Sequence, residues 1–240
     1  MTAMKVTKPV AIIPARGGSK RLSRKNIRPF AGRPMLAWTV EAAASTGLFA
    51  DIFVSTEDDE IAACAREAGA TVLKRPAEFA TDAAGIIDVL RQIISDGPNW
   101  PEIFCLLAAN CPLRTGDDIR AGYREFLDCE APAMLSVTSY GWTPPFRALF
   151  ETEAGLKFAF PEYAELKGQY YPDAVCSSGA VYWARSQCIA TADTLYVPGI
   201  RGFRMPWHRA VDIDTEDDMR LAACLFHAVK GGFSFDRPVE

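Results

Sequence analysis

The segment that decides the fold is IIPARGGSKRLSRKN, at residues 12–26. The β-branched apolar run within Val6–Pro14 is typical of a buried parallel strand, and a glycine-containing loop follows it. Pro34 then leads into MLAWTVEAAAST, where apolar residues recur at helical spacing until Gly47. Strand, loop and helix in this order predict the first unit of an α/β sheet.

The same alternation continues along the chain. Thr56 is predicted to cap the second helix, and the acidic run Glu57–Glu60 is predicted to form its first turn and not a metal site. Five such units with short connections predict an α/β fold with a Rossmann-like, mostly parallel sheet and helices on both faces. Further strands are predicted at 51–56, 71–74, 103–108 and 133–140, and further helices at 57–70, 82–95 and 117–127.

The alternation of strands and helices is interrupted between Gly141 and Ser178. This stretch holds four prolines and the short extended pieces RALFE and LKFAF. We predict that 141–178 forms an inserted arm or small subdomain within a single domain of residues 1–240. Beyond the arm we predict a strand AVYWA at 180–184, a short helix near Ser186, a strand LYVPG at 195–199 and a final helix that ends near Val229.

The composition excludes several classes of protein. The 240 residues include 26 Lys and Arg against 30 Asp and Glu, a net charge of −4 that disfavours a general nucleic-acid binder. The apolar run at 10–14 is too short for the core of a signal peptide, and nothing approaches the roughly 18 apolar residues of a membrane span. We therefore expect a cytoplasmic protein with no nucleic-acid or membrane partner.

The seven cysteines predict neither a disulfide framework nor a zinc site. They form no C-x-x-C pair, and only His208 and His227 could complete a metal site. Cys111 lies near the predicted sheet edge without a nearby partner in sequence, so we predict a packing thiol and not a nucleophile.

A basic block departs from this average, because seven basic residues and no acid lie between residues 14 and 33. Gly17 and Gly18 permit a tight turn close to a ligand, and positive charge comes from Arg16, Lys20 and Lys25. The loop matches neither G-x-x-x-x-G-K-[ST] nor G-x-G-x-x-G. A solvated basic loop is the alternative. Because ligands bind at the carboxyl ends of strands, we predict a phosphate cradle at an edge formed by 15–26, 75–82 and 108–114.

Several strings together resemble one family. They are PARGGSKR and RKNI in the first loop, RP-x-E from Arg75, CPLR after a strand, and VDIDTEDD near the end. This combination closely resembles the CMP-sialic acid synthetase (acylneuraminate cytidylyltransferase) family over about residues 8–226. WTPPFRAL at 142–149, Gln169 and SGAVYW at 178–183 are more similar to the pseudaminic acid branch.

The resemblance implies a nucleotide-diphospho-sugar transferase type of fold and CMP transfer from CTP to a free nine-carbon acidic sugar, with release of pyrophosphate. The sugar 2-hydroxyl oxygen would attack the α-phosphorus in line. The implied catalytic residues are Arg16, Lys20, Lys25 and Asp214. The implied CTP-binding residues are Ala15, Arg16, Gly17, Lys25, Asn26, Arg75, Asp82 and Ala84. Four further cations are expected to be structural or solvent-facing: Arg21, Arg24, Arg28 and Arg33.

The resemblance also implies Mg²⁺ as cofactor. Asp212 and Asp214 flank Ile213, so in a strand both carboxylates would project from one face, as a magnesium pair needs. The alternative is that Asp214 begins the last helix in a capping box with Asp217. With the family pattern, we expect Asp212 and Asp214 to bind the metal.

The sugar-binding residues implied are Asn110, Arg147, Lys167 and Gln169. Here the chain departs from its relatives, because Ala108-Ala109-Asn110-Cys111 replaces a run richer in hydroxyl and amide groups. Lys167 stands where the family has Arg, and a lysine supplies charge without the bidentate fork. The arm is expected to form a homodimer and to close over the neighbouring subunit's sugar site. Pseudaminic acid is the favoured acceptor. The alternatives are sialic, legionaminic or an octulosonic acid, or a catalytically silent CTP-binding regulator.

Overall fold

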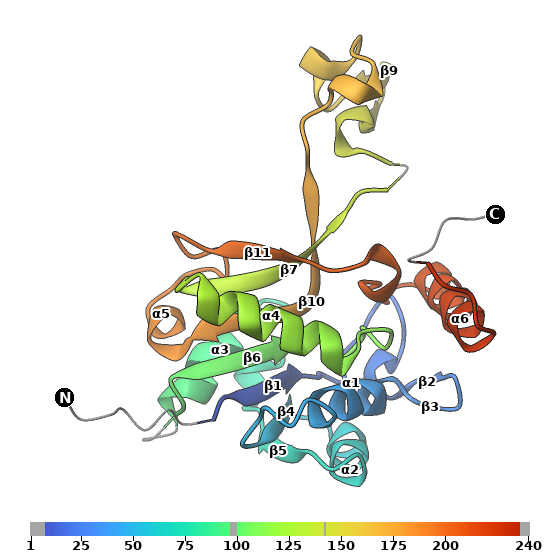
Figure 1. Ribbon diagram of the computed structural model, residues 1–240. Coiled ribbons are helices and arrows are strands. Elements are labelled where there is room, and N and C mark those ends of the chain that lie inside the picture. Colours follow the sequence, from blue (N-terminus) through green and yellow to red (C-terminus); the bar gives the residue numbers. More distant parts are fainter. Residues whose placement is uncertain (1–7, 97–99, 142, 236–240) are drawn as a thin grey trace.

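A seven-stranded sheet forms the centre of the molecule (Figure 1). The computed structural model describes residues 8–96, 100–141 and 143–235. The strand order is β11-β7-β10-β6-β1-β4-β5, in which β10 runs antiparallel to β6 and β7 and the other neighbours are parallel. The strands are β1 (Val10–Pro14), β4 (Ile52–Thr56), β5 (Thr71–Lys74), β6 (Ile103–Leu107), β7 (Ala133–Ser139), β10 (Val175–Arg185) and β11 (Arg201–Arg204). The predicted mostly parallel α/β sheet is confirmed.

Helices cover both faces of this sheet. Successive residues of β1 point to opposite faces, so Ala11 and Ile13 pack with α1, α2 and α4, whereas Val10 and Ile12 pack with α3 and α5. A smaller apolar cluster joins α6 to the loop after β1 through Leu22. The helices are α1 (Met35–Ala44), α2 (Asp59–Glu67), α3 (Ile86–Ser95), α4 (Gly116–Asp128), α5 (Ser186–Ala190) and α6 (Glu216–Lys230). Within the described ranges, none of these helices has both the length and the apolar character that crossing a bilayer requires.

Short elements complete the structure. Four two- to four-residue strands form two separate hairpins: β2 (Pro29–Phe30) with β3 (Arg33–Pro34), and β8 (Leu149–Thr152) with β9 (Gly155–Phe158). The 3-10 helices are η1 (Lys25–Ile27), η2 (Ala77–Phe79), η3 (Pro145–Arg147), η4 (Pro161–Tyr163), η5 (Gly168–Tyr170) and η6 (Trp207–Arg209).

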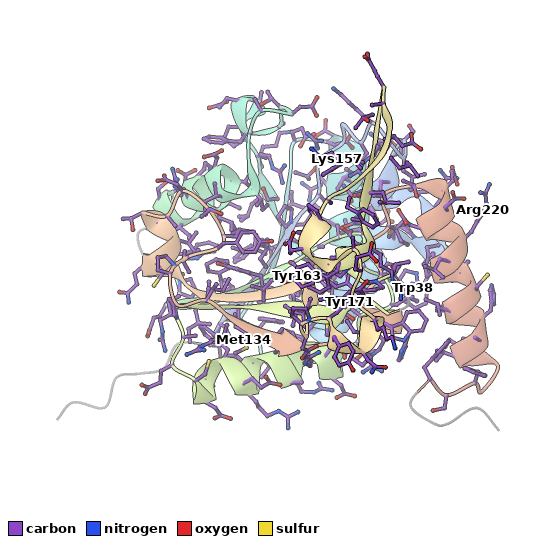
Figure 2. The ribbon with its side chains drawn as sticks, turned by 90° about the horizontal axis from the view of Figure 1, so that it is seen from above. Trp38, Met134, Lys157, Tyr163, Tyr171 and Arg220 are labelled. Atoms are coloured by element: carbon purple, nitrogen blue, oxygen red, sulfur yellow. The ribbon has the colours of Figure 1, made fainter. Side chains whose placement is uncertain are left out.

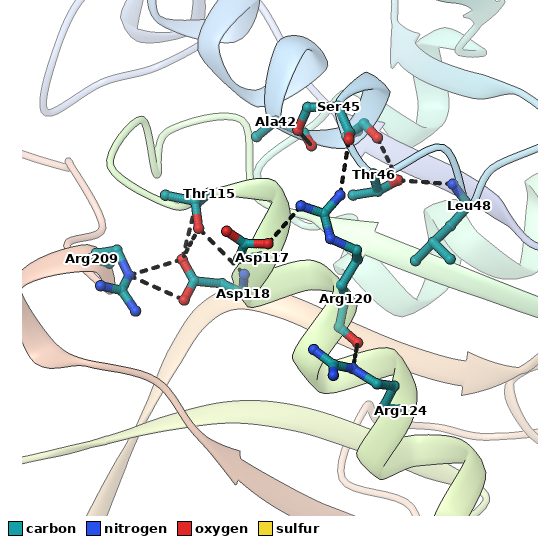
Figure 3. A network of polar contacts seen from close by, with 11 residues as sticks. Ala42, Ser45, Thr46, Leu48, Thr115, Asp117, Asp118, Arg120, Arg124 and Arg209 are labelled. Atoms are coloured by element: carbon teal, nitrogen blue, oxygen red, sulfur yellow. Dashed lines mark hydrogen bonds and ion pairs between the residues drawn. The ribbon is translucent and has the colours of Figure 1, made fainter.

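The helix N-termini show why the chain turns where it does. Thr115 caps α4 in a capping box with Asp118, whose carboxylate also accepts a 3.1 Å hydrogen bond from Arg209 Nε (Figure 3). The predicted cap of the second helix was wrong by two residues. Thr56 remains in β4, where its hydroxyl accepts the Asp58 amide, and Asp58 caps α2 by accepting the amides of Glu60 and Ile61.

Two further boundaries differ from prediction. The third helix begins at Ile86 and not at Asp82, because Gly85 is its N-cap and Asp82 turns instead toward the basic loop. The predicted strand LYVPG at 195–199 is absent from this described segment. Pro198 and Gly199 form a turn there, Gly199 with a φ of 81°, and the strand β11 follows it.

The segment between β7 and β10 projects from the body of the molecule as an arm (Figure 1). Ser139 pairs with Val175 where the two strands leave the sheet, and the β8–β9 hairpin lies beyond them. The predicted extended pieces RALFE (147–151) and LKFAF (156–160) therefore overlap β8 and β9. No described residue between 143 and 177 is fully buried. The arm packs mainly through one aromatic cluster, in which Tyr163 and Tyr171 lie edge to face (Figure 2).

Candidate active site

A cleft of about 460 Å³ opens at the carboxyl ends of β1, β5 and β6. Its walls come from the segments 14–26, 75–89 and 106–110, with Gly179, Leu195 and Asp214 completing them. This is the edge at which parallel α/β sheets bind ligands. The sequence placed 15–26, 75–82 and 108–114 along it, and each of these segments contributes to the walls.

Asp82 holds two cations on one side of the cleft. Arg16 Nη1 lies 2.9 Å from one carboxylate oxygen, and Lys20 Nζ lies 2.5 Å from the other. Hydrogen bonds from Lys20 and then from Arg16 lower the pKa of the Asp82 carboxyl. The side chain of Lys20 is 78% exposed, so this pair is free to exchange partners.

Asp214 holds two further cations at the cleft. Lys25 Nζ lies 2.6 Å from Oδ1, and Arg21 Nη2 contacts Oδ2. The Lys25 side chain is only 19% exposed, which strengthens its electrostatic interactions relative to those of Lys20. Arg21 was expected to be structural or solvent-facing, and its side chain is 69% exposed, but it also lines the cleft and pairs with a predicted catalytic carboxylate. Sequence reasoning missed it because its neighbours in the basic block have the same chemistry.

Asn26 and Arg75 line the cleft and also fasten its backbone. Asn26 Nδ2 donates to the Arg16 carbonyl at 2.9 Å. Arg75 is 5% exposed and donates to the Ser55 carbonyl at 2.8 Å, and burial lowers its pKa. Ala84 also lines the cleft, whereas Ala15 is fully buried beneath it.

Gly17 contacts the turn that follows β4. Its amide donates to Glu57 Oε1 at 2.8 Å, and a Cβ on it would lie 2.5 Å from Asp58 Oδ2. A larger residue would therefore displace the Asp58 side chain, and Gly17 is not among the described residues that line the cleft. Arg24 reinforces this junction through Asp58, with N–O distances of 2.5 and 3.2 Å.

Asp212 and Asp214 converge on Asn110. Asn110 Nδ2 contacts Asp212 Oδ1 and lies 3.5 Å from Asp214 Oδ1, and it donates to the Ile213 carbonyl at 2.9 Å. The predicted strand is wrong, since 211–214 lies outside any strand. The buried Ile213 side chain and its backbone bond to Asn110 nevertheless orient the segment.

Asp212 and Asp214 do not cap the last helix. Thr215 caps α6 with Asp218, so the alternative in which Asp214 forms a capping box with Asp217 is wrong. Asp212 keeps contact with solvent, but surrounding protein and then the like charge of Asp214 raise the pKa of its carboxyl. A cation between the two carboxylates would relieve that repulsion.

The predicted sugar-binding residues do not come together within one chain. Asn110 lines the cleft, but Arg147, Lys167 and Gln169 are exposed on the arm and are not among its described lining residues. Leu195 and Phe79 line the cleft and were not predicted. Leu195 was hidden within the wrongly predicted strand. No signal in the sequence marked Phe79.

Cys111 is fully buried, and burial raises the pKa of its thiol to about 12. A thiol that is not ionised at neutral pH is a poor nucleophile, so its environment agrees with the predicted packing role.

Comparison with known proteins places the chain among relatives. A family model described as cytidylyltransferase matches residues 10–124. Pseudaminic acid cytidylyltransferase of Campylobacter jejuni serotype O:2 is 30% identical over 224 residues, which cover 91% of this chain and 96% of that relative. N-acylneuraminate cytidylyltransferase of Streptococcus agalactiae serotype III is 30% identical over 88% of this chain, which spans 51% of that relative.

Solved structures agree in fold. CMP:2-keto-3-deoxy-manno-octonic acid synthetase complexed with CTP has a TM-score of 0.71 at 17% identity, covering 93% of this chain and 100% of that one. A cytidylyltransferase from Leptospira borgpetersenii serovar Hardjo-bovis has a TM-score of 0.57 at 14% identity, covering 97% and 99%. The similarity to the Campylobacter jejuni enzyme extends over nearly the whole of both chains, so this chain belongs to the cytidylyltransferase family and is a nucleotidyltransferase.

Proposed function

We propose that the protein transfers CMP from CTP to the anomeric hydroxyl of a nonulosonic acid, with pseudaminic acid as the favoured acceptor, and releases pyrophosphate. The observation that carries the proposal is the pair of carboxylates, Asp82 and Asp214, that hold four cations along one cleft at the carboxyl edge of the sheet. A triphosphate carries enough negative charge to replace those contacts. The relative of similar length, named pseudaminic acid cytidylyltransferase, supports this acceptor.

The reaction needs charge stabilisation more than covalent chemistry. The acceptor oxygen forms a bond to the α-phosphorus, its proton leaves, and the bond to the bridging oxygen of pyrophosphate breaks. Arg16, Lys20 and Arg21 bind the departing phosphates. Lys25 is the least exposed of the lysines at the cleft and sits beside Asp214, where it stabilises negative charge on the reacting phosphate.

The donor set of the site fits Mg²⁺. Asp212 and Asp214 would hold the ion, with phosphate oxygens and water completing its shell, since Mg²⁺ takes one or two carboxylates in such sites. Burial and then the like charge of Asp214 raise the pKa of Asp212, and a bound cation would offset both effects. When bound, Mg²⁺ supplies neutralisation of the triphosphate. Asn110 would keep the two carboxylates oriented.

A homodimer would bring the sugar-binding residues to a cleft. Arg147, Lys167 and Gln169 project on the arm, and the arm exposes large apolar side chains, with Phe150 62% and Leu156 68% exposed. Aromatic and aliphatic residues of this kind favour a protein interface. In this proposal the arm of one subunit closes over the cleft of its partner, and its cations meet the acceptor carboxylate. We place the enzyme in the cytoplasm, where CTP is available.

Pyrophosphate release tests this function. Purified protein is incubated with CTP, Mg²⁺ and a panel of pseudaminic, sialic, legionaminic and octulosonic acids, and initial rates are compared. The highest kcat/KM is expected for pseudaminic acid. A higher value for another acid reassigns the acceptor, and CTP binding without turnover on any acid supports a silent regulator instead.

A further inference from the structure

Arg114 is a buried cation that the cleft chemistry does not use. It is 3% exposed, and burial lowers its pKa. Among the described residues, no carboxylate lies within ion-pair distance of its guanidinium. Its hydrogen bonds go to neutral oxygens: Nη1 donates to the Ala180 carbonyl at 2.5 Å and to the Ala108 carbonyl at 3.3 Å. Burying a cation on neutral partners is costly, so the arrangement calls for a reason beyond packing.

One acceptor of these hydrogen bonds lines the cleft, and the others lie beside residues that do or bond to them. Nη2 donates to Thr39 Oγ1 at 2.8 Å, and that hydroxyl lies 3.3 Å from the carbonyls of Ala108 and Ala109. Ala108 and Ala109 line the cleft, as does Gly179, the neighbour of Ala180. Arg114 therefore joins the end of β6 to β10 directly behind the cleft surface.

The bonded part of β10 is where its ladder is interrupted. The register with β7 shifts between Ser177 and Tyr182, and Gly179 has a φ of 65°. On the β7 side, the Ser136 and Ser178 hydroxyls lie 2.6 Å apart, and Ser136 Oγ also accepts the Val181 amide at 3.0 Å. Side chains therefore supply hydrogen bonds that the strand ladder lacks at this bulge. Ser136 supplies one of them from β7, and Arg114 supplies another by donating to the Ala180 carbonyl.

The loop held by Arg114 also carries Asn110. Asn110 follows Ala108 by two residues, and its backbone carbonyl accepts the Ile213 amide at 3.0 Å while its side chain contacts Asp212. A shift of Ala108 would therefore move Asn110 relative to the two carboxylates. A displacement of about 1 Å at such a site is enough to lower a rate on the order of a hundredfold.

We propose that Arg114 is a positioning residue for the acceptor end of the cleft. By tying Ala108 to Ala180 it fixes the wall against which the acceptor lies and the loop that orients Asn110. The proposal rests on the proposed function, because it assigns the acceptor to this end. The hydrogen bonds of Arg114 go to Ala108, Ala180 and Thr39 and not to the loop after β1, so its loss should separate acceptor use from metal-free nucleotide binding.

The test compares Arg114→Met with Arg209→Met. Arg209 donates a hydrogen bond to the buried Asp118 in the first turn of α4, the helix that follows Arg114 (Figure 3). Arg209 lies outside the described cleft lining, so it is the matched control for lost stability. Arg114→Met is expected to lower kcat/KM for the acid sugar by about 30-fold or more, with a change of under about threefold in the Kd for CTP measured without Mg²⁺. Arg209→Met is expected to lower the melting temperature and leave kcat/KM within about twofold.

A second variant and a second readout guard against misfolding. Arg114→Lys keeps one charged donor and is expected to recover part of the lost kcat/KM. Amide hydrogen exchange should rise in Ala108–Cys111 and Ser178–Val181 for both Arg114 variants. In an Asn110→Ala background, Arg114→Met should cost less than about threefold further, because residues that act through one another are not additive.

The outcomes are distinct. If wild-type protein uses no acid sugar, the proposed function fails, and hydrogen exchange still tests what Arg114 holds. If wild-type protein is active and Arg114→Met resembles Arg209→Met in acceptor kcat/KM, or if CTP affinity falls as much as acceptor use, Arg114 is structural only and the proposal is overturned.

Discussion

Lys25 and Lys167 are both lysines predicted to serve one reaction, yet their surroundings are opposite. Lys25 is 19% exposed, begins a 3-10 helix beside the cleft and lies 2.6 Å from Asp214. Lys167 is exposed on the arm, at the N-cap of another 3-10 helix. The difference indicates that a single chain organises the nucleotide end of the site in advance. In the proposed function, the acceptor end would depend on residues that this chain holds away from its own cleft.

The largest effect is expected from a substitution at the nucleotide end of the site. Asp214→Asn keeps the shape of the side chain and removes the charge that holds Lys25 and Arg21, so kcat is expected to fall by about 10³-fold or more. Initial rates of pyrophosphate release across a Mg²⁺ titration measure it. Asp217→Asn is the control, because that side chain is 87% exposed and pairs with Arg220 on the surface. Near-normal turnover of Asp214→Asn would remove Asp214 from the metal and catalytic roles.

The next effect tests whether the arm serves the partner's cleft. Asp214→Asn and an Arg147→Ala/Lys167→Ala variant are each expected to be nearly inactive alone. After mixing and subunit exchange, half of the dimers hold both kinds of subunit, and one site in each has an intact cleft and an intact arm. Activity should recover to about a quarter of wild type. No recovery, despite exchange verified by mass spectrometry, would mean that each arm serves its own chain or none.

A smaller effect separates Arg21 from the rest of the basic block. Arg21→Ala is expected to lower kcat/KM for CTP about tenfold, because a cation at the cleft is lost. Arg28→Ala removes a cation that pairs with Glu216 outside the described cleft lining, and it should stay within about twofold of wild type. Equal effects of the two substitutions would return Arg21 to a general electrostatic role.

The smallest effect concerns the junction behind the basic loop. A hydrogen bond from Arg24 lowers the pKa of Asp58 below its ordinary value of 3.8, so the folded state favours the charged carboxylate. The resulting stability is fully present above pH 3.8 and is lost as the pH falls through the folded pKa.

Asp58→Asn keeps a helix cap and removes the charge, so the free energy of unfolding at pH 7 should fall by about 0.5–1 kcal/mol. The difference from wild type should vanish in acid. Denaturant unfolding at a series of pH values measures it. Asp59→Asn is the control, because that carboxylate is 96% exposed. A difference that persists at low pH would attribute the effect to the cap and not to the charge.

Much of the fold could be predicted because local patterns and tertiary structure agree. The two-sided burial of β1 and the capping box at Thr115 each depend on residues that are close together in the sequence. The bulge at Gly179 and the turn at Pro198–Gly199 could not be placed in this way, because they depend on how strands far apart in sequence pair.

The candidate site likewise has features that residue type predicts and features that only the folded chain determines. The chemistry of Lys25 and Asp214 was accessible from residue type and motif. The partners of Gly17 were not, since Glu57 and Asp58 approach it only after β4 is aligned beside β1. Arg21 differs from Arg28 only in what the fold brings near it. The fold, and not composition, decides which of these cations line the cleft.

Asp82 and Asp214 act as built-in counter-ions for the cleft. An exposed basic patch would be screened by dissolved salt, whereas here the protein supplies the opposing charges itself. Binding a triphosphate therefore exchanges one set of ion pairs for another. Its electrostatic contribution is the difference between the two sets and not the sum of four attractions. A cytidine ligand with fewer phosphates offers less charge for that exchange, so the cleft itself would discriminate by phosphate number.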